Sequence, residues 1–191
     1  MALAKYKFNN QSGFTLVETL VATTMLAVAL TALAELFAIS VKNNAVAKNG
    51  TFTSVLGSQK MEQLRGLTYG FDVLGLPITD TTTDTSVSPE TPTGKTGLAP
   101  SPTNTLQEST DGYVDYLDAN GVMLGGGTVV PNNTAYIRRW FVEPLPTNPN
   151  NTLILQVLVT RSRNRGAADI GSVARGPDEA RLITVKTRKA Q

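Results

Sequence analysis

Glu18 is the ionisable residue whose position in this sequence most needs a chemical explanation. It stands inside an apolar run from Phe14 to Val41 that contains one other charged residue, Glu35. A carboxylate that enters an apolar environment without a partner costs several kcal/mol. We therefore expect a positive charge to meet Glu18 in the functional form of the protein.

A proteolytic cut next to Gly13 would supply that charge. Residues 1–13 form a short polar leader, and its last residue, Gly13, gives a protease close access to the backbone. Cleavage between Gly13 and Phe14 creates an α-ammonium group at Phe14, about one helical turn from Glu18. That ammonium would neutralise the carboxylate in the same copy or in a neighbouring one.

Most kinds of catalytic chemistry are excluded by composition. The 191 residues include no Cys and no His. This rules out disulfides, thiolate metal sites, Ser–His and Cys–His nucleophile pairs, and histidine acid–base catalysis. The sequence also offers no recognisable carboxylate site. We expect a protein that is not an enzyme and that uses no metal and no cofactor.

The apolar run that holds Glu18 has the length of a membrane anchor. Residues 14–34 would span roughly 31 Å as a helix, which matches the core of a bilayer. Lys5 and Lys7 precede the run, and the leader that contains them has no Asp or Glu. The positive-inside rule then places the N-terminus in the cytoplasm and the chain beyond Val41 outside. We assign the anchor to residues 14–41.

A helical pattern continues beyond the anchor as far as Arg65. Apolar residues recur at roughly helical spacing among polar ones and predict a helix over residues 14–65 whose second half is amphipathic. They are Ala45, Phe52, Val55, Leu56, Met61 and Leu64. Gly50 and Gly57 each cost about 1 kcal/mol relative to Ala, which predicts a bend or local melting near them.

The rest of the chain predicts a loop followed by a small sheet. Residues 66–112 join the helix to the sheet, and residues 77–112 are so rich in Thr, Ser, Pro, Asp and Gly that we expect an exposed loop. Residues 113–191 form the head domain. Its predicted strands are 113–117, 122–124, 136–142, 153–160 and 181–187. Short turns, including the Asn-Gly of Asp118–Gly121, favour antiparallel pairing under the amphipathic part of the helix, an α+β fold.

Within the predicted strand 136–142, two neighbouring cations require partners. Arg138 and Arg139 point to opposite faces of a strand, so at least one should meet a carboxylate or solvent. Tyr136 and Trp140 are expected to pack in the core between sheet and helix.

Charge is distributed unevenly along the chain. Residues 66–137 carry one Lys against eight acids, whereas residues 138–191 carry ten Lys and Arg against four acids. This asymmetry favours complementary surfaces within the chain or between copies. Arg161, Arg163 and Arg165 form a short basic cluster in the second segment. A solvated turn is the more frequent meaning of such a cluster, and contact with nucleic-acid phosphates is the alternative.

The hexapeptide Gly13–Glu18 (Gly-Phe-Thr-Leu-Val-Glu), followed by Leu20-Val21-Ala22, resembles the class III signal peptide of type IV prepilins and type II secretion pseudopilins. The resemblance implies that a prepilin peptidase cuts after Gly13 and N-methylates Phe14. It also implies that Glu18 occupies the glutamate position used in assembly. The resemblance further implies a single-pass protein of the bacterial inner membrane. Its head would lie in the periplasm, and the protein would later enter a pilus.

The predicted strands 136–142 and 153–160 resemble the sheet of PilV-like minor pilins and of I-type minor pseudopilins, although PilV-like members often carry Trp where this chain has Arg161. The resemblance implies a minor pilin that joins or primes a type IV pilus with other pilin subunits. A minor pseudopilin of a type II secretion system is the alternative.

Two other interpretations of the N-terminus remain open. A conventional signal peptidase would recognise Ala32-Leu33-Ala34 and release a secreted chain that begins at Glu35. An uncleaved anchor would leave Glu18 without a partner. Either would fit a secreted or anchored protein that binds DNA or a surface.

Overall fold

The computed structural model describes residues 13–162 and 179–189, and the described chain divides after Ala45 into two compact units. Its elements, in chain order, are α1 (Leu16–Gly66), β1 (Tyr69–Phe71), β2 (Pro77–Thr79), β3 (Val114–Leu117), β4 (Met123–Gly126), β5 (Tyr136–Pro144), β6 (Thr152–Arg161) and β7 (Ala180–Thr187). The predicted combination of one long helix and an antiparallel sheet is confirmed.

The first unit contains the apolar part of α1. Its large apolar side chains, from Leu16 to Val41, are exposed on every side of the helix. The hydroxyls of Thr19, Thr23, Thr24 and Thr31 donate to backbone carbonyls three or four residues earlier, at 2.7–3.0 Å. A helix that is apolar all round and has satisfied the hydroxyls of these threonines suits an apolar environment. By length and composition, α1 can cross a membrane.

In the second unit, α1 packs through one stripe against the sheet. The buried residues of the stripe are Thr53, Leu56, Gly57, Lys60, Met61 and Leu64. The helix continues without interruption through Gly50 and Gly57, so the expectation of local melting is wrong. A Cβ at position 57 would lie 2.8 Å from Leu182 Cδ1, which means that the glycine lets α1 approach β7 closely. Val55, expected on the apolar face, is 58% exposed instead.

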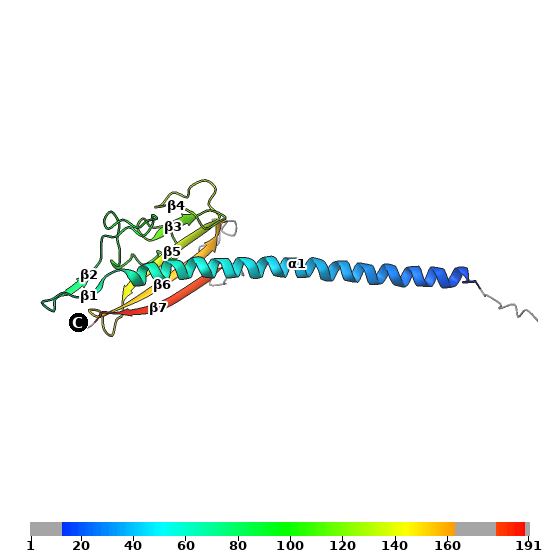
Figure 1. Cartoon of the computed structure of the whole chain (residues 1–191), viewed down its shortest axis with the longest axis horizontal. Helices are drawn as coiled ribbons and strands as arrows, with labels where there is room; N and C mark the ends of the chain where they lie inside the picture. The colour runs from blue at the N-terminus through cyan, green and yellow to red at the C-terminus, as the bar shows by residue number, and fades with distance from the viewer. Residues whose placement is uncertain (1–12, 163–178, 190–191) are drawn as a thin grey trace, which may run out of the picture. The chain divides into compact units, whose positions relative to one another are not determined.

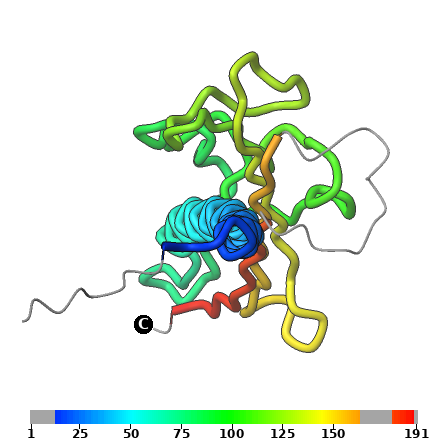
Figure 2. The backbone as a smooth tube through the Cα atoms, turned by 90° about the vertical axis from the view of Figure 1, so that its right-hand side faces the viewer, coloured from blue at the N-terminus to red at the C-terminus, as the bar shows by residue number. Residues whose placement is uncertain are grey.

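The main sheet has five antiparallel strands in the order β4-β3-β5-β6-β7. Residues 46–66 of α1 cover one face of it, as Figures 1 and 2 show. The largest buried side chain between helix and sheet is Trp140 on β5. Tyr136 of the same strand packs against Phe52 of α1, with the two rings tilted and a centroid separation of 5.2 Å. Both aromatic residues are therefore core residues, as predicted.

The Asn-Gly signal does mark the hairpin between β3 and β4. Gly121 has a φ of 82°, a conformation that glycine adopts at little cost. Its N–H donates to the Asp118 carbonyl at 3.1 Å, and the Asp118 carboxylate accepts from the N–H groups of Asn120 and Val122, each at 2.8 Å. Side-chain and main-chain hydrogen bonds thus fix the turn together.

The segment between helix and sheet is more structured than the sequence suggested. It contains the antiparallel pair β1–β2, and residues 83–86 and Leu98 are buried, so the expectation of an exposed loop over residues 77–112 is wrong at these positions. Polar side chains are buried here because they bond one another. Asp84 accepts from Ser86 N–H at 2.8 Å and from Ser86 Oγ at 2.6 Å. Satisfied polar groups can be buried at little cost.

Candidate functional site

The first candidate site is the start of α1. Gly13, Phe14 and Thr15 precede the helix and are exposed, and no atom lies within 4 Å of a Cβ built on Gly13. The peptide bond between Gly13 and Phe14 is therefore outside regular structure and open to a protease. Among the described residues, none places a steric demand for glycine at this position.

Thr15 and Glu18 form a reciprocal cap at the N-terminus of α1. The Glu18 N–H donates to Thr15 Oγ1 at 3.3 Å, while Glu18 Oε2 accepts from the Thr15 N–H and from Thr15 Oγ1, each at 3.0 Å. This is a capping box, in which two helix-terminal N–H groups are satisfied by side chains. Sequence reasoning missed it, although a Thr followed three residues later by Glu, at the start of an apolar run, is its usual signal.

The cap leaves part of the carboxylate available. Both hydrogen bonds to Glu18 end on Oε2, so among the described residues Oε1 has no donor. A carboxylate near a helix N-terminus is also stabilised by the partial positive charge there. Glu18 can therefore cap its own helix and still accept a further donor.

Of the basic residues that the sequence singled out in the leader and in the Arg161–Arg165 cluster, Arg161 is the one that the structure describes. Arg161 is the last residue of β6, pairs with Tyr136 in the sheet register and is half-buried. Four further basic residues lie outside the described part of the chain: Lys5, Lys7, Arg163 and Arg165.

The second candidate site is a buried group of charges in the head, formed by Lys60, Asp115 and Arg138. Arg138 binds Asp115 in a bidentate manner, with Nε to Oδ1 and Nη2 to Oδ2 both at 2.9 Å. Lys60 Nζ lies 2.8 Å from Asp115 Oδ2. All three side chains are at most 1% exposed. One carboxylate thus holds two cations, each from a different element.

Further contacts complete the coordination of the two cations. Lys60 Nζ donates to the Thr85 carbonyl and, at 3.2 Å, to Thr85 Oγ1, and it lies 3.9 Å from the centroid of the Trp140 ring. Arg138 Nη1 donates to the Leu56 carbonyl of α1 at 2.9 Å. Burial lowers the pKa of Lys60 to about 8; Asp115 opposes this shift and Arg138 adds to it.

This arrangement is suited to holding elements together. Lys60 belongs to α1, Asp115 to β3 and Arg138 to β5, and Thr85 comes from the connecting segment. Both carboxylate oxygens of Asp115 are already bound by cations. Among the described residues, no group of three or more His, Cys, Asp or Glu side chains could hold a metal. The expectation that Arg138 or Arg139 meets a carboxylate is confirmed for Arg138. The signal missed in the sequence was Lys60, a single cation on the otherwise apolar stripe of α1.

Fold and site together define a class of protein. A helix that is apolar all round at its start and capped beside an accessible Gly-Phe bond continues into an amphipathic half, which packs on an antiparallel sheet. This is the α+β architecture of pilin-like proteins.

Comparison with known families gives the same class from sequence. Residues 8–34 match the family model described as the prokaryotic N-terminal methylation motif, a stretch that includes Gly13, Phe14 and Glu18. The match supports a type IV pilin or pseudopilin precursor, a class of structural subunits, and the apolar start of α1 fits an anchor in the inner membrane. It also implies processing by prepilin peptidase and assembly with other pilin subunits. Neither the curated proteins nor the solved structures provide a match to the chain.

Proposed function

We propose that this protein is a minor pilin, cleaved and N-methylated by prepilin peptidase and then incorporated into a type IV pilus or the complex that primes its assembly. The observation that carries the proposal is the position of Glu18. It lies within the matched methylation motif and in the first turn of an apolar helix, beside an accessible Gly13–Phe14 bond.

Processing would change the electrostatics of the helix terminus in one step. Lys5 and Lys7 hold the leader on the cytoplasmic side, in keeping with the positive-inside rule. The cut removes the leader and leaves a positive charge on Phe14. Methylation preserves that charge while it makes the group less hydrophilic.

The capping box gives Glu18 a role before and after the cut. In the precursor, its Oε2 caps α1 through Thr15. After the cut, its second oxygen would accept from the ammonium of Phe14, in the same subunit or in a neighbouring one. Apolar packing of the helices supplies most of the affinity between subunits, and the charge pair sets their register, because an unpaired charge in such a place is expensive.

The resemblance of strands β5 and β6 to both PilV-like minor pilins and I-type minor pseudopilins supports a minor subunit, and a minor pseudopilin of a type II secretion system stays the alternative. A minor instead of a major subunit is supported by the long acidic connecting segment and by the absence of Cys, since no C-terminal disulfide can form. The genes that adjoin this one would distinguish pilus from secretion system: pilus motor and minor-pilin genes in one case, a secretion operon in the other.

Three substitutions separate the charge of Glu18 from its capping role. Glu18→Gln keeps a side chain that can cap the helix but removes the charge. Thr15→Ala weakens the cap by about 1 kcal/mol and keeps the charge. Glu18→Ala removes both. We expect all three precursors to be cleaved, Thr15→Ala to enter filaments, and both Glu18 variants to enter them poorly.

Mass spectrometry of the mature N-terminus and the amount of subunit in sheared filaments are the two measurements. Methylated Phe14 supports the processing step, whereas a chain that begins at Glu35 or retains Met1 contradicts it. Normal incorporation of Glu18→Gln would show that the charge pair is not needed.

A further inference from the structure

The loop between β1 and β2 holds large apolar side chains out in solvent. Val73 is 91% exposed, Leu74 is 80% exposed and Leu76 is 59% exposed. The three residues lie within four consecutive positions at the end of a narrow antiparallel hairpin. Single exposed apolar residues are common on protein surfaces, but a group of this kind marks an interaction site.

The turn that carries these side chains is fixed by hydrogen bonds. Asp72 Oδ1 accepts from the N–H groups of Leu74 and Leu76, at 2.9 and 2.7 Å. The Asp72 N–H donates to the Leu76 carbonyl at 2.9 Å, and Gly75, with a φ of 76°, donates to the Asp72 carbonyl at 3.0 Å. The apolar tip is therefore preorganised, and little further ordering is needed when it binds.

Arg188, which follows β7, fixes the base of the hairpin. Its guanidinium donates to the carbonyls of Gly70 and Ile78, at 3.1 and 2.8 Å, and lies 4.2 Å from the centroid of the Tyr69 ring. These contacts join β1 and β2 to the end of β7. The same residue also places a positive charge directly behind the apolar tip.

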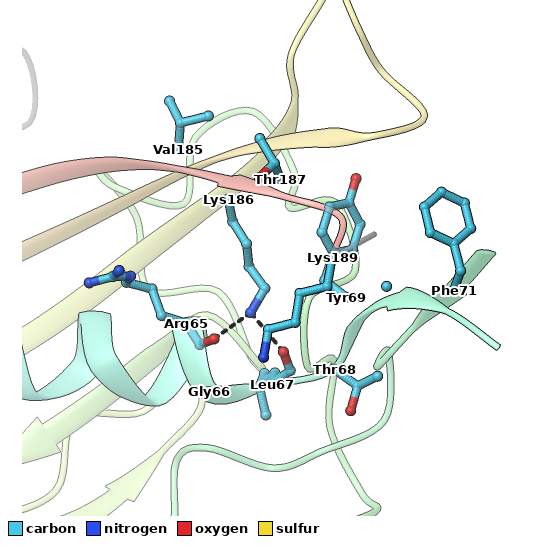
Figure 3. Close-up of a pocket in the computed structure, with 11 residues that line it drawn as sticks. Arg65, Gly66, Leu67, Thr68, Tyr69, Phe71, Val185, Lys186, Thr187 and Lys189 are labelled. Atoms are coloured by element: carbon cyan, nitrogen blue, oxygen red, sulfur yellow. Dashed lines mark hydrogen bonds between the residues drawn. The ribbon is translucent and has the colours of Figure 1, made fainter. Parts of the chain in front are cut away.

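Basic residues surround the base of the hairpin. A cavity of about 510 Å³ beside β1 is lined by Arg65, Lys186 and Lys189 and by no Asp or Glu (Figure 3). Lys186 donates to the carbonyls of Arg65 and Leu67 at the end of α1. Burial lowers the pKa of Lys186, and the positive charges of Lys189 and Arg65 lower it further. The three cations are therefore close enough to repel one another.

Of the basic residues at this base, Arg65 alone forms an ion pair with a carboxylate among the described residues. Arg65 pairs with the exposed Glu62 at 2.9 Å. Lys186, Arg188 and Lys189 take part in no ion pair among the described residues, and the hydrogen-bond acceptors of Lys186 and Arg188 are neutral oxygens. The hairpin thus carries the apolar tip together with the carboxylate of Asp72, and the positive charge behind it comes from Arg65 of α1 and from Lys186, Arg188 and Lys189 at the end of β7.

We infer that this hairpin is a docking element for an anionic lipid surface, which it enters through Val73, Leu74 and Leu76. The basic residues at its base, among them the exposed Lys189, then face lipid phosphates, and the half-buried Phe71 at the end of β1 lies between tip and base, while Tyr69 stays in the core. This order of apolar, aromatic and basic groups is the order in which interfacial segments meet a bilayer. A lipid surface is favoured over a protein pocket because the tip is convex, and a bilayer receives such a tip without a complementary cavity. The inference does not depend on the role in a pilus.

Flotation with vesicles tests the inference on the full chain. The protein is held by its own helix in nanodiscs of neutral phosphatidylcholine and mixed with vesicles, either of phosphatidylcholine alone or of phosphatidylcholine with phosphatidylglycerol. We expect it to float with the anionic vesicles and not with the neutral ones. The double variant Val73→Asp, Leu74→Asp should reduce flotation by about tenfold or more, because both apolar contacts are lost. Lys189→Glu should also reduce it.

Val129→Asp is the matched control, since Val129 is 79% exposed but lies on the segment between β4 and β5. It should float as well as the unaltered protein, and Trp140 fluorescence should be the same in all variants, as expected of surface changes. Three results would overturn the inference: no flotation with anionic vesicles, equal flotation with neutral vesicles, or a tip variant that behaves like Val129→Asp. Binding of the tip to a protein instead of a lipid would appear as the first of these results.

Discussion

Replacing Asp115 by Asn tests whether the buried charge group holds the head together. The substitution hardly changes side-chain size, but it removes the only carboxylate that binds Lys60 and Arg138 in this group. Two cations would then stay buried beside a neutral amide. Neutralising Asp115 leaves more uncompensated charge than neutralising either Lys60 or Arg138 would.

The expected effect follows from burial. Removing one partner of a buried ion pair typically costs about 3–5 kcal/mol, because the remaining charge has lost both its partner and its water. Asp115 is fully buried and binds its two partners at 2.8 and 2.9 Å, so we expect a value within that range. Since domains of this size are stable by only about 5–15 kcal/mol, the variant should lose a large share of its stability.

Trp140 provides a local reporter for the measurement. It is the single Trp of the chain, it is buried in the head, and Lys60 Nζ lies 3.9 Å from its ring centroid. Urea unfolding of the full chain in mild detergent, followed by Trp emission, therefore reports on the head. With a slope of about 2 kcal/mol per M, the midpoint should fall by roughly 2 M.

The exposed pair Lys95–Asp111 is the matched control. Its N···O distance of 2.6 Å is shorter than those from Asp115 to Lys60 and Arg138, but the Asp111 side chain is 60% exposed. Asp111→Asn should cost less than about 1 kcal/mol, since solvent replaces the lost partner. If Asp115→Asn proved no more costly than Asp111→Asn, the reasoning from burial would be refuted.

Two further predictions concern neighbouring contacts. The pKa of Lys60 is about 8 in the folded state, below its ordinary value of about 10.4, so the unfolded state binds more protons between these limits. Accordingly, the free energy of unfolding should rise more with pH across that window in the unaltered protein than in Lys60→Met. If urea titrations gave both proteins the same pH dependence, the lowered pKa of Lys60 would be contradicted. Arg188→Met should increase hydrogen exchange of the β1 and β2 amides by tenfold or more while the urea midpoint of Trp140 emission changes little, because Arg188 fixes the hairpin and not the main sheet. Unchanged exchange in β1 and β2 would show that other contacts hold the hairpin.

Much of the fold could be predicted because its signals are local. The lengths of the apolar run and of the helical pattern placed α1 within two residues of its observed ends, and alternation with β-branched residues located β5 and β6. The errors occurred where packing overrides a local preference. Gly57 was expected to weaken the helix, yet the helix continues through it, and the absence of a side chain there leaves room for Leu182. Residues 83–86 were judged too polar to bury, yet Ser86 donates to Asp84, Thr83 donates to Asp80, and Thr85 accepts from Lys60.

The sequence by itself determined the N-terminal site. Gly13, Phe14 and Glu18 lie within six residues of one another, so composition, helical spacing and charge are sufficient to relate them. The capping box could have been found in the same way, because Thr15 and Glu18 are also neighbours in the chain.

Only the tertiary structure decided the groups whose members are distant in the sequence. Lys60, Asp115 and Arg138 come from three elements and meet because strand register and helix packing direct them to one point. The basic base of the β1–β2 hairpin likewise depends on residues more than a hundred positions later, at the end of β7. No local pattern encodes such meetings, since each residue alone is compatible with a solvated surface, and their energies arise only after burial removes the water.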